Sequence, residues 1–539
     1  WQKIKRNVRS LHERIFFRPL LAAVSTLSRD EVVLSEQAAQ DRLAALGYRD
    51  PRGAMRHIKA LTTGLSRSAD IQRHLMPVLL GWFARGVDAD AGLLGFRIVS
   101  ESLGSTSWYL RMLRDSPAAA ERLSQLLSSS RLMTDLLEDA SASIAWLDKV
   151  DDLKALGEEA LESEISSLLA RHEDAAEAMR AVRYLRRRET LRTAMGWTLG
   201  IVDVEDTCAG LAAIDECTIG AALRIALREL QSTAEESEAG ETAGEQLLTR
   251  IAIIGMGRLG GAENGFGSDA DVMFVHEPLE GVDEDAAQEQ AARIVNRTLA
   301  LLKQPVKPAI RAERPLEVDA DLRPEGKQGA IVRSLDSYRS YYERWAETWE
   351  FQALTRARPI GGDPQLGEAF VELIDPYRYP ATFTPEQVQQ IRRMKARVEN
   401  ERMPHGADRT RQLKLGRGGL SDVEWLVQLL QLRHAHAVPG LRTTSTLKAL
   451  DAAVEAGLVA AEDAEVLSGA WLLATKIRGG NVLRGVRQSD TLPSGRADLE
   501  AIARWCGYPA GSARALEEDY LRQTRNARKV YERLFFDEA

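Results

Sequence analysis

The chain has 539 residues, too many for one hydrophobic core, and this length predicts three or four domains. Apolar residues make up 44% and charged residues 28%, which is typical of a soluble globular protein. Lys plus Arg number 71 against 79 Asp plus Glu, a net charge of −8, so the basic field common in nucleic-acid-binding proteins is missing. We therefore expect no nucleic acid among the partners.

The sequence also indicates where the protein works. It has no uninterrupted apolar segment long enough to span a bilayer, so no membrane partner is expected. The three cysteines, Cys208, Cys217 and Cys506, show neither metal-binding nor redox spacing, which indicates a reducing compartment. The chain begins at Trp1 without a signal-peptide pattern. We expect a cytoplasmic protein cut from a longer one.

The periodicity of apolar residues predicts a predominantly α fold with an embedded α/β module and flanking helical bundles. Residues 1–112 and 113–245 indicate successive helices, because apolar side chains recur every three or four positions. Residues 246–365 change to a β pattern, and residues 366–539 return to helix. An acidic stretch without large apolar residues, 232–246, predicts a loop or boundary before the β pattern begins.

The most informative stretch runs from Arg250 to Pro278. An apolar, β-rich run enters a glycine-rich loop, which leads through Ser268, Asp269 and Asp271 into a second β-rich run, Val272–Val275. Glycine lets a backbone approach a phosphate closely. Carboxylates two positions apart on a strand share one face of it. The stretch therefore favours binding of a nucleoside triphosphate.

A third acidic segment strengthens this interpretation. Residues Leu316–Leu322 alternate apolar and polar side chains, which predicts a strand carrying Asp319 and Asp321 on one face. Mg²⁺ prefers carboxylates together with substrate phosphates, and two such ions can hold the oxygens of an in-line displacement. By itself the Ser-Asp-Ala-Asp pattern is equally typical of a turn or a helix cap. Its position between the glycine loop and a further acidic strand favours catalysis.

A dinucleotide-binding fold is the competing interpretation. Gly255-Met-Gly257-Arg-Leu-Gly260 fits G-x-G-x-x-G after a strand, with Glu277 near the place of a ribose-binding acid. Parallel strands need a crossover of about a dozen residues. Only residues 262–269, which include poor helix formers, separate the loop from the next strand. The spacing disfavours this fold.

At these residues the chain resembles a known family, the glutamine-synthetase adenylyltransferases of the DNA polymerase β-like nucleotidyltransferase superfamily. Four separated motifs carry the resemblance, and they stand in the family's order. They are Gly257-Arg-Leu-Gly-Gly-Ala-Glu-Asn-Gly-Phe-Gly-Ser-Asp-Ala-Asp-Val-Met-Phe, Glu317-Val-Asp-Ala-Asp-Leu-Arg-Pro-Glu-Gly, Trp349-Glu-Phe-Gln-Ala-Leu-Thr-Arg-Ala-Arg and Lys414-Leu-Gly-Arg-Gly-Gly-Leu-Ser-Asp-Val-Glu-Trp.

The resemblance implies an enzyme with two homologous halves around a regulatory helical region. One half of such an enzyme removes AMP from glutamine synthetase by phosphorolysis, and the other attaches AMP from ATP to a tyrosine hydroxyl. The Trp349 motif, and the end of the chain soon after Leu534-Phe-Phe, resemble the adenylylating half. ATP would be the substrate, Mg²⁺ the cofactor, and the PII signal protein and glutamine the effectors.

The resemblance also implies a set of site residues. Asp269 and Asp271 would bind Mg²⁺, and Asp319 would complete a site for two ions. One departure concerns Asp321, which stands where the family commonly has arginine and either alters the site or faces Arg323. The residues expected to contact the nucleotide are Gly257, Arg258, Gly260, Gly261, Ser268 and Arg323. Lys414 and Arg417 either contact phosphate or the target, or only form the entry to a helix.

Other functions stay open at the level of sequence. The same chemistry would serve deadenylylation by phosphorolysis or uridylyl transfer to a PII protein. A regulatory or scaffold module would carry a degenerate site, which the intact Asp-x-Asp pattern disfavours. A dinucleotide-dependent oxidoreductase is the most distant alternative.

Overall fold

The computed structural model describes residues 29–103, 108–232, 246–311, 313–485 and 489–536, so the acidic stretch 232–246 falls outside it except for its two ends. The chain forms two compact units. Unit 1 comprises residues 1–154, 191–203 and 483–486, and unit 2 comprises 155–190, 204–482 and 487–539. Among the described helices, none combines the length and apolarity needed to cross a bilayer. The division into four domains stays a prediction.

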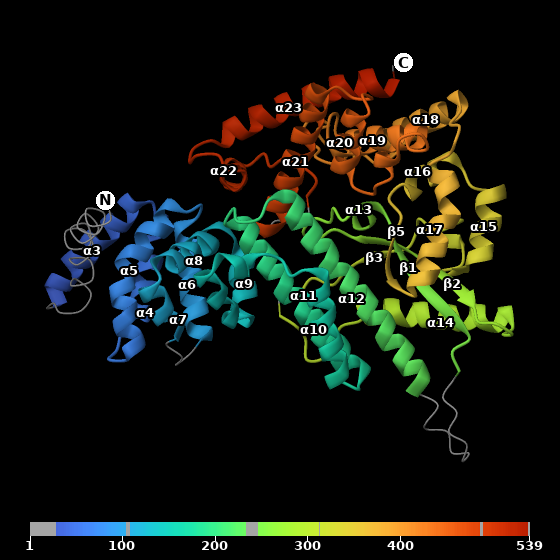
Figure 1. Cartoon of the computed structure of the whole chain (residues 1–539). Helices are drawn as coiled ribbons and strands as arrows, with labels where there is room; N and C mark the ends of the chain where they lie inside the picture. The colour runs from blue at the N-terminus through green and yellow to red at the C-terminus, as the bar shows by residue number, and fades with distance from the viewer. Residues whose placement is uncertain (1–28, 104–107, 233–245, 312, 486–488, 537–539) are drawn as a thin grey trace, which may run out of the picture. The chain divides into compact units, whose positions relative to one another are not determined.

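Unit 1 is helical, as its periodicity predicts (Figure 1). On the helix at residues 117–129 the regularly spaced Leu123, Leu126 and Leu127 are fully buried. Ser116 caps that helix by accepting the Ala119 N–H. The elements are α3 (Arg29–Leu46), α4 (Pro51–Thr62), α5 (Arg67–Arg85), α6 (Ala89–Ser102), α7 (Trp108–Asp115), α8 (Pro117–Ser129), α9 (Arg131–Asp139), η2 (Ser141–Asp148), η3 (Val150–Leu153) and the end of α11 (Ala175–Thr198).

Unit 2 contains a small mixed sheet. Strands β1 (Thr249–Gly255) and β2 (Ala270–Pro278) form an antiparallel pair, and β5 (Arg358–Gly362) pairs antiparallel with β1. The short strands β3 (Val318–Asp319) and β4 (Arg333–Ser334) run parallel to β2 on its other edge. A dinucleotide fold needs parallel strands on either side of its glycine loop. The antiparallel β1–β2 pair excludes that fold here.

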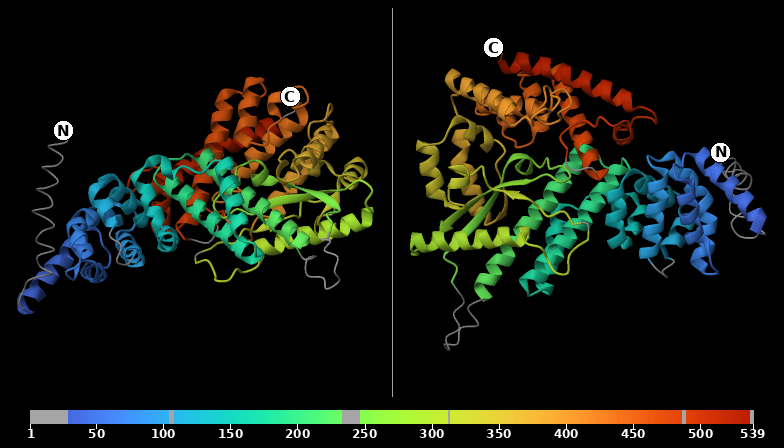
Figure 2. Two further views of the ribbon diagram at one scale, coloured as in Figure 1. Left: turned by 60° about the horizontal axis from the view of Figure 1, so that its bottom comes forward. Right: turned by 180° about the vertical axis from the view of Figure 1, so that it is seen from behind.

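Both faces of the sheet are covered by helices, which explains the nearly continuous apolar runs of β1 and β2 (Figures 1 and 2). Alternate residues point to opposite faces. Ile251, Ile253, Val272 and Phe274 pack into the core under α10 (Glu158–Arg171), α12 (Val204–Ser232) and α14 (Glu284–Lys303). Ala252, Ile254, Met273 and Val275 pack against α15 (Leu335–Arg344), α16 (Thr348–Leu354) and α17 (Pro364–Arg378).

The third predicted strand is shorter than expected. We predicted Leu316–Leu322, but β3 ends at Asp319, whose Oδ1 accepts the N–H of Asp321 at 2.7 Å. Such a side-chain bond to the backbone two residues on turns the chain. Asp321 therefore does not share a strand face with Asp319. Its carboxylate lies 3.6 Å from Arg323 and 3.2 Å from Lys327.

The remaining helices confirm the expected return to α structure. The apolar periodicity of residues 287–303 predicts an amphipathic helix, and α14 contains it, beginning slightly earlier behind its cap, Asp283. After the sheet, helices share a core that includes the fully buried Trp471. They are α18 (Pro385–Glu401), α19 (Leu420–His434), η5 (Pro439–Leu441), α20 (Thr446–Glu455), α21 (Ala461–Leu483), α22 (Arg496–Trp505) and α23 (Ala513–Phe536), with η4 (Gly326–Gln328) lying earlier, between β3 and β4.

Candidate functional site

Two of the predicted acids meet where neighbouring strands run side by side. Asp271 is the second residue of β2 and Asp319 is the last residue of β3, and the two are direct register partners in the parallel pairing. Asp271 is half-buried, whereas Asp319 is exposed. Asp269 lies two residues before Asp271 in the exposed end of the loop. The structure thus brings Asp271 and Asp319 together, with Asp269 beside them along the chain.

The charges around Asp271 make this a strongly negative place. Burial, together with the nearby carboxylates of Asp319 and Asp269, raises the pKa of Asp271 to about 6 against the opposing effect of the Lys414 ammonium. Three carboxylates that repel one another favour a bound cation. Lys414 is close enough to influence the same carboxylate, although it lies more than 140 positions along the chain.

The donor set suits magnesium only in part. Among the residues that the structure describes, no group of three or more His, Cys, Asp or Glu side chains is arranged to hold a metal ion. Mg²⁺ commonly uses one or two carboxylates and takes its other ligands from substrate phosphates and water. The Asp271–Asp319 pair fits that mode of binding. Completion of the site by Asp269 stays a prediction.

Gly257 lies directly against the acid pair. Its φ of +52° is in the left-handed region, and a Cβ atom there would lie 2.2 Å from Oδ2 of Asp271. Only glycine adopts this conformation readily and leaves space for the carboxylate. Glycine is therefore needed at position 257 for two reasons, the left-handed backbone and the space occupied by the Asp271 carboxylate.

Gly260 and Gly261 pack closely against Arg356, which leaves no space for a side chain at either position. A Cβ atom on Gly260 would lie 1.9 Å from the carbonyl oxygen of Arg356, and one on Gly261 would lie 2.7 Å from the Arg356 guanidinium carbon. Their N–H groups donate within the loop, to the carbonyls of Met256 and Gly257. The structure gives both glycines a packing role against Arg356. Their contact with a triphosphate is not tested by this geometry.

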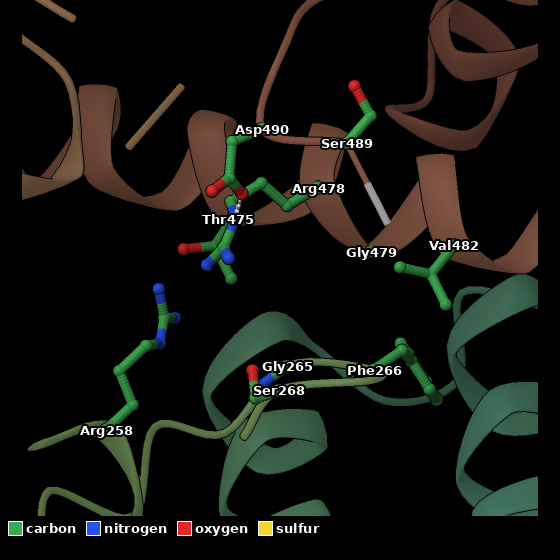
Figure 3. A pocket seen from close by; sticks show the side chains of 10 residues that line it. All are labelled: Arg258, Gly265, Phe266, Ser268, Thr475, Arg478, Gly479, Val482, Ser489 and Asp490. Atoms are coloured by element: carbon green, nitrogen blue, oxygen red, sulfur yellow. Dashed lines mark hydrogen bonds and ion pairs between the residues drawn. The ribbon is translucent and has the colours of Figure 1, made fainter. Parts of the chain in front are cut away.

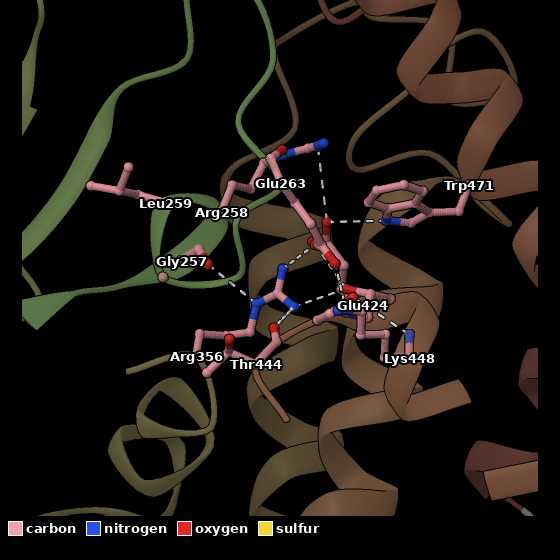
Figure 4. A network of polar contacts seen from close by, with 12 residues as sticks. Gly257, Arg258, Leu259, Glu263, Arg356, Glu424, Thr444, Lys448 and Trp471 are labelled. Carbon is pink, nitrogen blue, oxygen red and sulfur yellow. Dashed lines mark hydrogen bonds and ion pairs between the residues drawn. The ribbon is translucent and has the colours of Figure 1, made fainter. Parts of the chain in front are cut away.

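Two arginines donate to carbonyl oxygens of the glycine loop, and Figure 4 shows the first of them, Arg356, beside Gly257. Arg356 Nε donates to the Gly257 carbonyl at 3.2 Å, and Arg358 Nε donates to the Gly260 carbonyl at 3.1 Å. Arg358 also forms an ion pair with Glu216 of α12 at 2.5 Å. Both arginines lie in the Trp349 motif, but no role was predicted for them from sequence. The two arginines are two positions apart, the second at the start of β5, and this spacing was the sequence signal that could have indicated a shared role.

A buried ion pair connects the same loop with α20. The Arg356 guanidinium contacts the Glu263 carboxylate, and their side chains are only 6% and 7% exposed. Thr446, the first residue of α20, donates its N–H to Glu263 at 2.5 Å and its hydroxyl to the same carboxylate at 3.0 Å. Glu263, inside the glycine-loop motif, is thus a structural anchor that sequence reasoning missed.

Ser268 and Arg323 have local partners. Ser268 Oγ accepts the Gly265 N–H at 3.0 Å and closes the turn that leads into Asp269. Arg323 donates to the carbonyl oxygens of Ala320, Lys327 and Gly329, all within its own loop. The geometry therefore lends no support to Arg323 as a nucleotide contact.

Lys414 and Arg417 are exposed on the loop that leads into α19. Asp422, which is buried, accepts the Gly418 N–H at 2.7 Å and forms ion pairs with Lys395 at 2.8 Å and with Arg528 at 3.0 Å. The predicted helix-entry loop held by Asp422 is therefore present. The charge of Lys414 lowers the pKa of Asp271, so this loop carries a cation near the acids.

Comparison with known proteins finds similarity to two family models. Residues 120–373 match the family model described as glutamate-ammonia ligase adenylyltransferase. This segment, which includes the sheet, is therefore similar to that adenylyltransferase family. Residues 392–535 match a second model, described as GlnD PII-uridylyltransferase. The first match contains the glycine loop, the acid pair and the two loop-binding arginines, and the second contains the Lys414 loop.

Similar curated proteins extend the adenylyltransferase resemblance over the whole chain. Bifunctional glutamine synthetase adenylyltransferase/adenylyl-removing enzymes from Leifsonia xyli subsp. xyli and Streptomyces avermitilis are each 49% identical to it, and the one from Streptomyces coelicolor is 48% identical. Each alignment covers 99% of this chain and 52%, 54% and 54% of the relative, respectively. The chain thus spans about half the length of the curated relatives it matches.

Proposed function

We propose that the chain transfers AMP from ATP to a tyrosine hydroxyl of glutamine synthetase. The observation that carries the proposal is the register pairing of Asp271 with Asp319 beside Gly257, inside a segment similar to the adenylyltransferase family. The names of the similar curated proteins support glutamine synthetase as the protein substrate. A polymerase β-like fold for the catalytic module is part of the same proposal.

The transfer is a displacement at phosphorus. The tyrosine oxygen forms a bond to the α-phosphorus of ATP while the bond from that phosphorus to the pyrophosphate oxygen breaks. Tyrosine ordinarily has a pKa of about 10, so its proton needs an acceptor. Asp319, exposed at the end of β3, takes that proton, and Lys414 offsets negative charge beside Asp271. Mg²⁺ held by Asp271 and Asp319 would polarise the α-phosphate and balance the carboxylate charge.

Removal of AMP is the second candidate. The similar curated proteins carry both activities in their names, and this chain spans about half of their length. In phosphorolysis, an oxygen of inorganic phosphate forms a bond to the phosphorus of the attached AMP while the bond from that phosphorus to the tyrosine oxygen breaks. ADP is formed, and a proton returns to the tyrosine oxygen to restore its hydroxyl. The residues of the Trp349 motif resemble the adenylylating half, which supports attachment of AMP as the main activity.

We also propose that the PII signal protein and glutamine act as effectors in the cytoplasm. The similarity of residues 392–535 to PII-uridylyltransferases supports an involvement of PII. Glutamine rests on the family resemblance alone.

The direction of the reaction is tested with labelled nucleotide. The 539-residue chain is incubated with Mg²⁺, glutamine synthetase and ATP labelled at the α-phosphate. Covalent label on a tyrosine of glutamine synthetase supports attachment. Release of labelled ADP from pre-labelled glutamine synthetase on addition of phosphate, without attachment, supports removal. Labelling of PII by UTP, or no transfer in any arm, would overturn the proposal.

A further inference from the structure

A second polar pocket lies beside the glycine loop within unit 2 (Figure 3). One side is the turn from Gly265 to Ser268, and the other is α21 together with Ser489 and Asp490. Arg258 points into the space from the loop, opposite Thr475 and Arg478 of α21 (Figure 3). No predicted function uses Thr475 or Arg478.

The pocket contains donors without acceptors. Among the described residues, Nη1 and Nη2 of Arg258 and Oγ1 of Thr475 are buried and have no hydrogen-bond partner. The Nε atom of Arg258 donates to the Glu263 carbonyl, so the guanidinium is fixed at one end only. The nearest acid, Glu424, lies 4.0 Å from Nη1, beyond hydrogen-bond distance. Buried polar atoms of this kind normally have a partner.

The charges identify the missing partner as an anion. Within the part of the chain that the structure describes, Arg478 donates from Nε to Asp490 at 2.6 Å. Burial and then the charge of Arg258 lower the pKa of Arg478, because the two guanidinium groups are close enough to repel each other. An oxyanion between them would accept hydrogen bonds from Arg258 and Thr475 and relieve that repulsion. Guanidinium groups match phosphate oxygens in geometry as well as in charge.

We propose that this pocket, the Arg258–Arg478 pocket, receives the terminal phosphates of the nucleoside triphosphate and retains pyrophosphate as it leaves. The proposal rests on the proposed function. Backbone continuity connects the pocket to the acids, because Arg258 follows Gly257 and Ser268 precedes Asp269. The empty space is about 300 Å³ including the open mouth, and the inner end admits about one water-sized group. Phosphate oxygens reach the donors while the phosphorus stays at the mouth.

The test measures binding of pyrophosphate directly. Magnesium pyrophosphate and inorganic phosphate are titrated calorimetrically into the 539-residue chain and its variants. Arg478→Gln should weaken pyrophosphate binding about ten- to hundredfold, the usual worth of a hydrogen bond to a charged group. Thr475→Val should weaken it about tenfold without lowering thermal stability, because the lost hydroxyl has no partner in the free protein. Lys476→Gln, the matched control on α21, removes a cation near Cys506 and should change neither.

The outcomes separate this pocket from the proposed function. Weaker pyrophosphate binding in both pocket variants supports the pocket even if no AMP transfer is found, in which case only the proposed function fails. Unchanged pyrophosphate affinity in both variants, with normal AMP transfer, overturns the pocket alone. Inorganic phosphate could instead bind as tightly as pyrophosphate and lose the same affinity in the two pocket variants. That result would identify a site for free phosphate and overturn the assignment to the triphosphate. The assignment to the triphosphate would also be overturned if Lys476→Gln weakened pyrophosphate binding as much as the two pocket variants.

Discussion

At the scale of single residues, the glycine loop is fixed mainly by charged side chains that bind its carbonyl oxygens. Arg356 and Arg358 donate to these oxygens, and Glu263 and Glu216 hold the two guanidinium groups. Glu263 and Arg356 are almost fully buried, and removing one partner of such a pair typically costs about 3–5 kcal/mol. The shape of the loop therefore depends on residues that come nearly a hundred positions later.

Gly257→Ala tests how closely the loop and the acid pair fit. A methyl group there would overlap Oδ2 of Asp271 and strain a backbone with φ of +52°. A displaced carboxylate lowers the rate strongly, so we expect AMP transfer to fall about a hundredfold or more. The matched control is Gly220→Ala, where a Cβ atom would meet nothing within 4 Å. Equal transfer rates in the two variants would show that the contact with Asp271 is unimportant.

At the scale of elements, β2 is the organising strand. It pairs with β1 on one edge and with β3 and β4 on the other, and both of its faces are buried. Asp271 is the second residue of this strand, and His276 lies near its other end. His276 is buried and contacts Thr249 of β1 at 3.0 Å and Gln288 of α14 at 2.9 Å. Its role is structural, as its place opposite Asp271 in the strand alternation predicts.

The burial of His276 makes stability depend on pH. Burial lowers its pKa below the usual 6.5, more than its hydrogen bond with Gln288 raises it. Below pH 6.5 the unfolded chain therefore binds a proton that the folded chain does not, and the free energy of unfolding falls as the pH drops. Urea denaturation between pH 7.5 and 5.5 should show this fall in the wild type and a smaller fall in His276→Gln. His405→Gln, at an exposed position, should keep the wild-type dependence, and a wild-type slope in His276→Gln would contradict the assignment.

The sequence predicted the elements with strong patterns better than the contacts between distant segments. Strands β1 and β2 and helix α14 followed from apolar periodicity, and the short spacer excluded a crossover helix between the strands. The alternation at Leu316–Leu322 predicted too long a strand, because it continues past the turn made by the Asp319 side chain. The contact of Glu263 with Thr446 and the position of Arg258 opposite Arg478 were not predictable from sequence, because Thr446 belongs to α20 and Arg478 to α21.

At the scale of the whole molecule, unit 2 holds every residue assigned to the site. The acids come from the sheet, Lys414 from the entry to α19, and the donors of the Arg258–Arg478 pocket from the loop and α21. The two family models divide this unit between them, since one ends at residue 373 and the other begins at residue 392. The first match contains the sheet with the acid pair, and the second contains the helical region that carries Lys414 and Arg478.

The central claim is that the Asp271–Asp319 pair carries out AMP transfer, and one measurement tests it most directly. The initial rate of label transfer from α-labelled ATP to glutamine synthetase is compared for the wild type, Asp271→Asn, Asp319→Asn and Asp321→Asn. We expect losses of about a thousandfold or more in the first two variants, since each removes a group acting on the reacting phosphate. Their thermal stability should be unchanged or higher, because a repelling carboxylate is lost. Asp321→Asn should retain most activity, because its carboxylate pairs with Arg323 and Lys327. Near-wild-type transfer in a folded Asp271→Asn protein would contradict the account.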